Sequence, residues 1–523
     1  MRPAVGVGNV RRVEQVAWEK ELEEKKKRES QAEQMGGDEK VARQHGRGKM
    51  DVRQRIHKMA DPGSFREIGK LAGKGFYGPD GELEDFKPAN FLFGRADINR
   101  RPVVLTGDDF TVRGGAADAA IWRKAVLAEQ MAHEYKLPLI RLIDGTGGGG
   151  SVKMLEDMGL TYVPYLPGWE HVVKNLDSVP VVALALGSVA GLGAARVAAS
   201  HYSVMVRGLS HIFTAGPAVV AAIGENLDKE ALGGADIHGR NGTVDDVVNT
   251  EEEAFDAAKR FLSYLPSCAG SLPPRGETTD GVERRDESLL EAVPEDRRAA
   301  YSMRKILNTV MDRGSLMEIG RMWGRSSITA LARLNGWPVA VIASDPSFMG
   351  GSWSADGARK VERFVKLANT FSLPVVHFVD NPGFMIGLEA ERAATIRFGV
   401  EALNGIYKST VPWASVIIRK AYGVGGAAMS DHSRFQYRFA WPSGDWGSLP
   451  LEGGIEVAYK AELESAEDPA TALAEIKARL DKVRSPFRTA EAFMVEDVID
   501  PRDTRPLLCE FADLAQGKMT AGC

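Results

Sequence analysis

The chain has 523 residues, of which 44% are hydrophobic and 26% charged, and its net charge is −5. This is an ordinary soluble globular composition with apolar material for more than one domain, and it gives no reason to expect nucleic acid as a partner. The three cysteines form no CxxC pair, so they indicate neither a disulfide framework nor a zinc ribbon and fit a reducing cytoplasm.

The N-terminal segment is charged rather than apolar. MRPAVGVGNVRR is too short and too poor in apolar residues for a signal peptide, and acidic residues from Glu14 onward argue against a transit peptide. VEQVAWEKELEEKKKRESQAEQ, residues 13–34, predicts a surface helix, which we place in a charged helical arm at residues 1–44. Two interpretations stay open for this arm, a solvated segment and a partner-binding one.

LPLIRLIDGTGGGGSVK, residues 137–153, places a G-x-G-x-x-G pattern directly after a buried apolar strand. A dinucleotide-binding loop also needs an acidic residue about 20 positions further on, at the end of the next strand. That strand, VPVVALALG at residues 179–187, ends without a carboxylate. The glycines therefore need another explanation. The apolar run at residues 179–195 contains Pro180, three glycines and Ser188, which favours a strand, a turn and a helix over a membrane span.

The same motifs occur twice along the chain in the same order. Four pairs of segments match at offsets between 232 and 251 residues: 63–70 with 314–321, 101–116 with 337–352, 136–145 with 372–381, and 178–195 with 410–427. The offset falls from 251 to 236 after the first pair, so the first copy carries 15 extra residues around LAGKGFYGPDGELEDF. This internal repeat predicts two homologous domains.

Each copy alternates buried apolar strands with helices, the pattern of an α/β domain with largely parallel strands. We place an N-terminal domain at residues 45–267 and a C-terminal domain at residues 300–523. The linker is expected at residues 268–299, where CAGSLPPRGETTDGVERRDES is rich in proline, glycine and charge.

In both copies a buried strand leads into a glycine-rich turn just before a helix, AGLGA at residues 190–194 and YGVGG at residues 422–426. Amide groups at the start of a helix have no partner within it, and glycine lets a substrate approach them closely. Such a turn can form an oxyanion hole, in which each donor is worth about 2.7–4 kcal/mol. The alternative is that the glycines only allow tight strand–helix packing. Two equivalent turns favour a reaction that stabilises two carbonyl-type oxygens.

Other constellations are weak. His211 and His238 are spaced unlike metal ligands, and no metal site is predicted. Asp144 and Asp380 end equivalent strands, which favours loop capping over catalysis. The chain has no G-x-S-x-G or HExxH motif, and GGGGSVK lacks the GK[ST] ending of a phosphate loop. The predicted site therefore works through backbone dipoles rather than side-chain acids and bases.

Several stretches together carry a family resemblance: DVRQRIHKMADPGSFREIG (51–69), FTAGPAVVAAIGENLDKEALGGADIHGRNG (213–242), VDNPGFMIG (379–387), IIRKAYGVGGAAMS (417–430), FAWPS (439–443) and VIDPRDTRPLL (498–508). The sequence resembles the carboxyltransferase (β) subunits of biotin-dependent acyl-CoA carboxylases, the propionyl-CoA carboxylase-like group, over about residues 45–510. The resemblance implies two tandem crotonase-like domains built from ββα units, and a ligase complex of fatty acid metabolism.

The resemblance also implies a mechanism. Carboxybiotin on a separate carrier protein gives up CO₂, the biotin ureate takes a proton from the α (or vinylogous) carbon of an acyl-CoA, and the enolate attacks CO₂. One oxyanion hole holds the thioester enolate and the other the urea oxygen, without a side-chain base. By position, Gly191 and Leu192 match the hole of the first domain, and Val424 and Gly425 match that of the second.

The chain departs from the family pattern around the substrate. The usual DSGGAR after the first-domain strand is replaced by DGTGGGG, residues 144–150, so the arginine is missing. By resemblance this loop lies against the acyl-CoA pocket, which is widened here or contacts CoA differently. The residues assigned to substrate binding are Gly147, Gly148, Gly149, Gly423, Gly426 and Ala427. Because Ala427 stands where short-chain members often carry Asp, we expect a longer or unusual acyl chain rather than propionyl.

The family's site lies between the first domain of one subunit and the second domain of another. The resemblance therefore implies a homohexamer, a trimer of dimers, with a biotin carboxylase and a biotin carboxyl carrier as cytoplasmic partners. Two alternative functions stay open. One is a biotin-dependent acyl-CoA decarboxylase subunit that runs the transfer backwards. The other is a non-catalytic structural subunit of a mixed carboxylase complex, which the missing arginine and the altered hole residues keep open.

Overall fold

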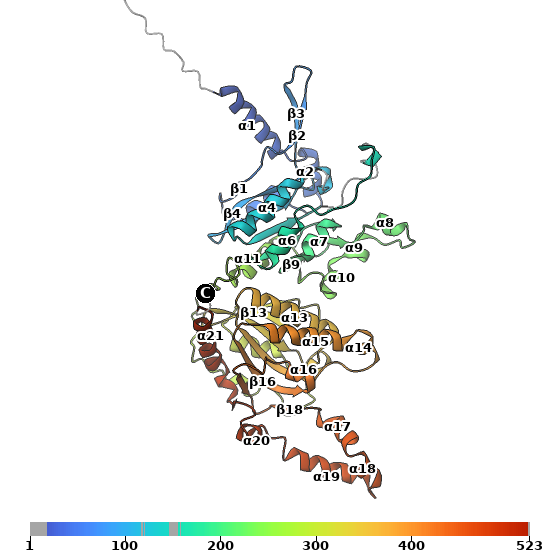
Figure 1. Ribbon diagram of the computed structural model, residues 1–523, viewed down its shortest axis with the longest axis vertical. Coiled ribbons are helices and arrows are strands. Elements are labelled where there is room, and N and C mark those ends of the chain that lie inside the picture. Colours follow the sequence, from blue (N-terminus) through green and yellow to red (C-terminus); the bar gives the residue numbers. More distant parts are fainter. Residues whose placement is uncertain (1–17, 117–118, 120, 146–154, 157, 521–523) are drawn as a thin grey trace, which may run out of the picture.

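The computed structural model describes residues 18–116, 119, 121–145, 155–156 and 158–520. It contains two large mixed sheets, one in each half of the chain, and Figure 1 shows the N-terminal half (blue to green) stacked on the C-terminal half (yellow to red). The predicted α/β class is confirmed. Among the described residues, no helix is both long and apolar enough to cross a membrane.

The N-terminal sheet has seven strands in the spatial order β1 (Arg66–Glu67), β4 (Phe91–Ile98), β5 (Arg101–Asp108), β6 (Leu139–Ile143), β7 (Val181–Ala185), β9 (Tyr202–Val206) and β11 (Asp246–Val248). The C-terminal sheet runs β12 (Met317–Ile319), β13 (Ser327–Leu334), β14 (Trp337–Ser344), β15 (Val375–Asn381), β16 (Trp413–Tyr422), β17 (Tyr437–Ala440) and β19 (Asp497–Val498), with β18 (Asp445–Gly447) beside β16. Two small pairs complete the strands, β2 (Gly73–Tyr77) with β3 (Leu83–Pro88) and β8 (Ser188–Ala190) with β10 (His211–Phe213).

The N-terminal half contains α1 (Glu19–Glu33), α2 (Asp38–His45), α3 (Val52–Met59), η1 (Arg113–Gly115), α4 (Trp122–Tyr135), α6 (Trp169–Leu176), α7 (Leu192–Ala198), α8 (Pro217–Ala221), α9 (Lys229–Gly233), α10 (Ala235–Arg240) and α11 (Glu251–Ser263). The C-terminal half contains α12 (Met303–Val310), η4 (Met349–Gly351), α13 (Ala355–Thr370), α14 (Leu388–Arg392), α15 (Thr395–Lys408), α16 (Gly423–Ala427), α17 (Leu451–Ala458), α18 (Lys460–Ser465), α19 (Pro469–Asp481), α20 (Pro486–Glu491), η5 (Pro501–Asp503) and α21 (Thr504–Thr520). The segment 268–299, our proposed linker, contains the short helix η3 (Glu287–Leu289).

The strand pairings show that the two halves are copies of one plan. Val104 lies opposite Leu139 in the first sheet, and Ala340 lies opposite Val375 in the second, each 236 residues further along the chain. In both sheets the first pairings are antiparallel, and the strands that follow are parallel. The repeat predicted from the sequence is therefore present in the register of the sheets.

Alternating residues of the N-terminal strands face two different layers. Phe91, Phe93 and Val104 belong to a cluster with residues of α4, whereas Leu92 and Leu105 belong to a larger cluster with residues of α3 and α11. This alternation follows from the two-residue period of a strand. Both faces of the sheet are therefore buried, which accounts for its nearly continuous apolar sequence.

The larger cluster continues from one half of the chain into the other. It includes Phe255 and Phe261 of α11 together with Phe364 and Phe371 of the C-terminal half. The contact between the two halves is polar at its margin, where the Arg363 guanidinium lies 3.0 Å from the Asp245 carboxylate. The two copies thus pack on each other through an apolar interior.

The same contact contains a carboxyl group that makes stability depend on pH. The Tyr202 hydroxyl donates to Asp246 at 2.6 Å. Burial, reinforced by the neighbouring Asp245, raises the pKa of Asp246 to about 7. The protonated carboxyl therefore contributes stability below the unfolded pKa of about 4, and this contribution is lost as the pH rises through about 7.

We expect urea unfolding of the wild-type chain to require less denaturant at pH 8 than at pH 5. Asn in place of Asp246 keeps the shape without the titrating proton, so this part of the pH dependence should disappear in Asp246→Asn. Identical pH profiles for the two proteins would contradict the assignment.

The N-terminal arm packs on the β2–β3 hairpin, which occupies the extra residues of the first copy. In α1, the Lys27 ammonium donates to the Leu83 carbonyl at 3.0 Å, and Arg28 donates to the Tyr77 hydroxyl at 3.2 Å. Past α1, the Gly36 amide donates to the Thr111 hydroxyl at 2.9 Å. The part of the arm that the structure describes is thus bound to its own chain. Figure 1 shows α1 and this hairpin together at one end of the molecule.

Candidate active site

The first predicted turn joins β8 to α7. Gly191 has φ 56° and ψ −123°, a backbone conformation that residues other than glycine rarely adopt. The amides of Leu192 and Gly193 lie in the first turn of α7, where the helix supplies no acceptor. Within the described part of the chain, neither amide has a hydrogen-bond acceptor. The turn therefore presents free donors.

These residues line a cavity of about 110 Å³ in the N-terminal half. Its wall also contains Gly115, Gly145, and the aromatic rings of Phe91, Trp122 and Trp169. The lining is largely apolar, and its polar members are the backbone donors, Asn90, Glu129 and a partly buried charge pair. It joins the end of β6 to the start of α7, so the segment after Asp144 begins beside the free amides.

The charge pair consists of Asp108 and Arg196, neither of which the sequence singled out. Burial raises the pKa of Asp108, and Arg196, 3.8 Å away, opposes this shift. Arg196 also lies over the Phe91 ring, 5.4 Å from its centroid. The position of each residue in the sequence could have marked it as a candidate for the site. Asp108 ends a strand of the repeat, and Arg196 is one helical turn beyond Leu192.

The second predicted turn joins β16 to α16. Gly423 has φ 58°, and the Val424 side chain is 52% exposed, so it leaves the backbone of the turn accessible. The Asn381 side chain fixes the turn, because its Nδ2 donates to the Gly425 carbonyl at 2.9 Å and its Oδ1 accepts from the Gly383 amide at 2.9 Å. Among the described residues the amides of Val424 and Gly425 have no acceptor.

The other residues predicted to bind substrate differ in burial, and some of them lie outside the described part of the chain. Gly426 is buried, and a Cβ there would lie 2.4 Å from the Ala421 carbonyl carbon, so this glycine serves the packing of the turn. Ala427 is exposed on α16. Gly147, Gly148 and Gly149 lie outside the described residues. The two turns belong to different halves of the chain, at α7 and α16 (Figure 1).

Asp144 is the centre of a buried ionic network. Its carboxylate lies 2.6 Å from the Lys49 ammonium and 2.7 Å from the Arg55 guanidinium, which also pairs with Glu251 at 2.7 Å. Arg55 and Asp144 are fully buried. A carboxylate held by two cations in this way ties α3, β6 and α11 together, which agrees with a structural role.

Asp380, the equivalent residue in the second copy, is bound in a similar way. It accepts from the Tyr301 hydroxyl at 2.8 Å and from Arg419 Nε at 3.2 Å. The histidines His211 and His238 also have protein partners, namely Glu230 and the Ile212 carbonyl. These side chains are thus already engaged in holding the fold.

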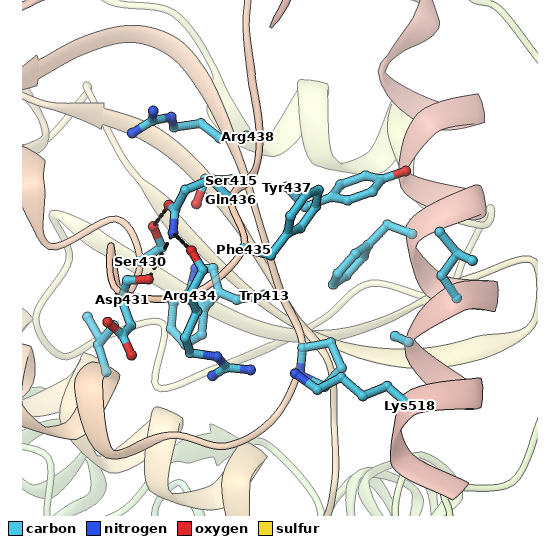
Figure 2. Close-up of a pocket in the computed structure, with 15 residues that line it drawn as sticks. Trp413, Ser415, Ser430, Asp431, Arg434, Phe435, Gln436, Tyr437, Arg438 and Lys518 are labelled. Atoms are coloured by element: carbon cyan, nitrogen blue, oxygen red, sulfur yellow. Dashed lines mark hydrogen bonds between the residues drawn. The ribbon is translucent and has the colours of Figure 1, made fainter. Parts of the chain in front are cut away.

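A separate cavity of about 330 Å³ lies against α21 in the C-terminal half. Figure 2 shows Trp413, Phe435 and Tyr437 on its apolar side, with Ser430 bonded to Gln436 at 2.8 Å. No residue of either glycine turn lines this cavity, and Trp413 lies at the opposite end of β16 from the second turn. The cavity is therefore not part of the proposed site.

Comparison with known proteins gives a consistent result. The family described as carboxyl transferase domain matches residues 43–521. The propionyl-CoA carboxylase carboxyltransferase subunit of Haloferax mediterranei is 31% identical over 507 residues, which cover 95% of this chain and 96% of that protein. The methylmalonyl-CoA decarboxylase subunit alpha of Veillonella parvula is 29% identical over 478 residues, covering 90% and 91%.

Among solved structures, transcarboxylase 12S aligns with a TM-score of 0.85 and 29% identity over 96% of this chain and 97% of that one. That structure is described as a hexamer assembly with hydrolysed methylmalonyl-coenzyme A bound.

Proposed function

This chain belongs to the carboxyl transferase family, and we propose that it moves a carboxyl group between biotin on a partner protein and an acyl-CoA. The observation that carries the proposal is the pair of glycine turns at equivalent positions of the duplicated fold. Each turn begins a helix, and each has amides without an acceptor among the described residues. Paired backbone donors suit a reaction that builds negative charge on two carbonyl oxygens.

In the first half, Gly191 and Leu192, with the amide of Gly193, would hold one of these oxygens. Because the donors are fixed by the turn, they need no reorganisation when charge develops on the substrate. The conformation of Gly191 lets the main chain reach the oxygen without a side chain in the way. The apolar cavity beside this turn supports an acyl group with substantial apolar surface.

In the second half, Val424 and Gly425 would hold the other oxygen, with Gly423, Gly426 and Ala427 around it. When bound, carboxybiotin supplies the carboxyl group and the base, so this chain needs only to orient both partners and stabilise their oxygens. The amides and the anchoring by Asn381 fit such a role.

The proposed assembly completes the site between subunits. The hexamer described for transcarboxylase 12S supports a homohexamer of this chain, with the first half of one subunit facing the second half of another. A biotin carboxylase and a biotin carboxyl carrier would deliver the carboxyl group at the expense of ATP and bicarbonate. A second direction of reaction, decarboxylation of an acyl-CoA onto biotin, is favoured by the similarity to the Veillonella parvula decarboxylase subunit.

The proposal predicts ATP-dependent fixation of labelled bicarbonate. The chain should co-purify with a biotinylated protein, and the complex should transfer label to at least one member of a panel of short, branched, aromatic and long acyl-CoAs. Loss of label from a carboxyacyl-CoA in the presence of free biotin would identify the reverse direction. A formed complex that transfers no carboxyl group in either direction would instead identify a structural subunit and overturn the proposal.

A further inference from the structure

The cavity beside the first glycine turn contains a charge pair whose members do not touch. Asp108 Oδ1 and Arg196 Nη1 are 3.8 Å apart, which is too far for a hydrogen bond. Both side chains line the cavity, and only 14% and 15% of their surface is exposed. Two opposite charges thus lie inside the fold without the direct contact that usually compensates for their loss of water.

The atoms of this pair that face each other have no other partner. Asp108 Oδ2 accepts from the Asp144 amide at 3.2 Å, whereas Oδ1 accepts no hydrogen bond from any described residue. Within the same part of the chain the Arg196 guanidinium donates no hydrogen bond, and it lies over the Phe91 ring. Burial raises the pKa of Asp108, and Arg196 opposes this rise, which favours the charged carboxylate. The pair therefore offers a hydrogen-bond acceptor and several donors to a ligand.

The second copy of the fold shows what these two positions need for folding alone. At the offset of 236 residues Asp108 corresponds to Ser344, whose Oγ accepts from the Asp380 amide at 3.3 Å. At the offset of 232 residues Arg196 corresponds to Ala428, which is fully buried. A serine and an alanine thus complete the same part of the plan. The two charges are an addition that only the cavity of the first copy contains.

The charge pair lies close to the free amides of the first turn. Arg196 is four residues beyond Leu192 on α7, so the two positions share one face of the helix, about 6 Å apart along its axis. Leu192, Gly193 and Arg196 all line the same cavity of about 110 Å³. A ligand whose carbonyl oxygen is bound by these amides therefore reaches the charge pair within a few bonds.

The gap within the pair suits a single oxygen atom. Two hydrogen bonds of about 2.8 Å can meet at one oxygen across any separation up to about 5.6 Å. That oxygen has to donate to the carboxylate and accept from the guanidinium. A hydroxyl does both, whereas a carboxylate has no proton to donate and an ammonium cannot accept. The rings of Phe91, Trp122 and Trp169 provide an apolar wall for the carbon chain that carries the hydroxyl.

This inference rests on the proposed function, which supplies an acyl-CoA as substrate. We propose that Asp108 and Arg196 form a subsite for a hydroxyl group on the acyl chain and so select hydroxyacyl thioesters over unsubstituted ones. The hydroxyl donates to Asp108 Oδ1 and accepts from Arg196, while the thioester oxygen lies at the amides of Leu192 and Gly193. A site built for a hydroxyl rejects the analogue that lacks it, because its own polar groups are then left unpaired.

The test uses the full-length double variant Asp108→Ser/Arg196→Ala, which gives the first copy the residues that the second copy has at these positions. The matched control is Glu462→Ser/Arg479→Ala, which removes an exposed acid–arginine pair from α18 and α19. Calorimetry measures the Kd of valeryl-CoA, 3-hydroxyvaleryl-CoA and glutaryl-CoA, whose acyl chains all have five carbons. Thermal melting verifies folding. Arg196→Met, which keeps the side-chain length without the guanidinium, provides a second reading if the double variant is unstable.

For the wild type and the control we expect 3-hydroxyvaleryl-CoA to bind about tenfold more tightly than valeryl-CoA. For Asp108→Ser/Arg196→Ala the two Kd values should become equal, because the Kd of the hydroxy compound rises about tenfold. Equal binding of both compounds by the wild type, or a preference that survives in the variant, would overturn the inference. So would tightest binding of glutaryl-CoA by the wild type, since Arg196 would then bind a carboxylate.

The binding measurement separates this inference from the proposed function. If no carboxyl transfer is found but the preference for the hydroxy compound depends on Asp108 and Arg196, the proposed function fails and the hydroxyl subsite holds. If transfer occurs and the wild type has the same kcat/KM for valeryl-CoA and 3-hydroxyvaleryl-CoA, the hydroxyl subsite alone fails.

Discussion

Replacing Gly425 with valine is expected to lower the kcat of carboxyl transfer by about 10²–10³-fold, the effect of losing one oxyanion-hole donor. A Cβ at this position would lie 2.9 Å from the carbonyl carbon and 3.0 Å from the Cα of Gly383, and 3.1 Å from the amide nitrogen of Phe384. All three are main-chain atoms, so the start of α16 must move instead. That movement would displace the amides of Val424 and Gly425.

The measurement is the initial rate of label transfer to acyl-CoA by the reconstituted complex. Gly405→Ala is the matched control, because within the described part of the chain a Cβ on this glycine of α15 would meet the Glu362 Cγ alone, at an ordinary contact distance of 3.6 Å. It should retain wild-type kcat. A Gly425→Val protein that melts like the wild type and keeps its kcat would show that the second turn is not an oxyanion hole.

Replacing Arg55 with methionine is expected to lower the free energy of unfolding by about 3–5 kcal/mol. Arg55 is fully buried and bonds Asp144, Glu251 and the Leu186 carbonyl. Methionine fills similar space but supplies no hydrogen-bond donor and no charge. The buried carboxylates of Asp144 and Glu251 therefore lose a cationic partner. Removing one partner of a buried ion pair costs far more than the pair contributes, since the desolvation penalty of the remaining charge persists.

Urea unfolding of the full-length protein measures this loss, and thermal melting provides a second reading if the variant is too unstable for a native baseline. Arg392→Met removes an exposed arginine whose partner Glu389 is also exposed, and should change stability by about 0.5 kcal/mol or less. Equal stabilities of the two variants would contradict the importance of the Arg55 network.

The features of the fold that depend on residues close together in the sequence could be predicted from it. The duplication, the parallel strands and both glycine turns depend on apolar runs and glycines within about ten residues of each other. The exposed Val424 side chain explains why a bulkier residue fits the second turn, which the sequence pattern alone made doubtful. The assignment of both turns as oxyanion holes, and the domain boundaries, stay predictions.

Groups assembled from distant residues could not be predicted in this way. Arg55 meets Asp144 across 89 positions and Glu251 across 196, and no local pattern marks such a partnership. The contact of the arm with the extra hairpin is of the same kind, because Lys27 donates to the Leu83 carbonyl across 56 positions.

The apolar cluster that passes from Phe261 into Phe371 has a consequence for the chain as a whole. Each copy has apolar clusters of its own, but the largest cluster is completed only by residues of both copies. Cutting the polypeptide between them would leave each fragment with an apolar surface exposed to water and prone to aggregation. The duplicated ancestry therefore does not make the halves separable modules, and damage to one is transmitted to the other during denaturation.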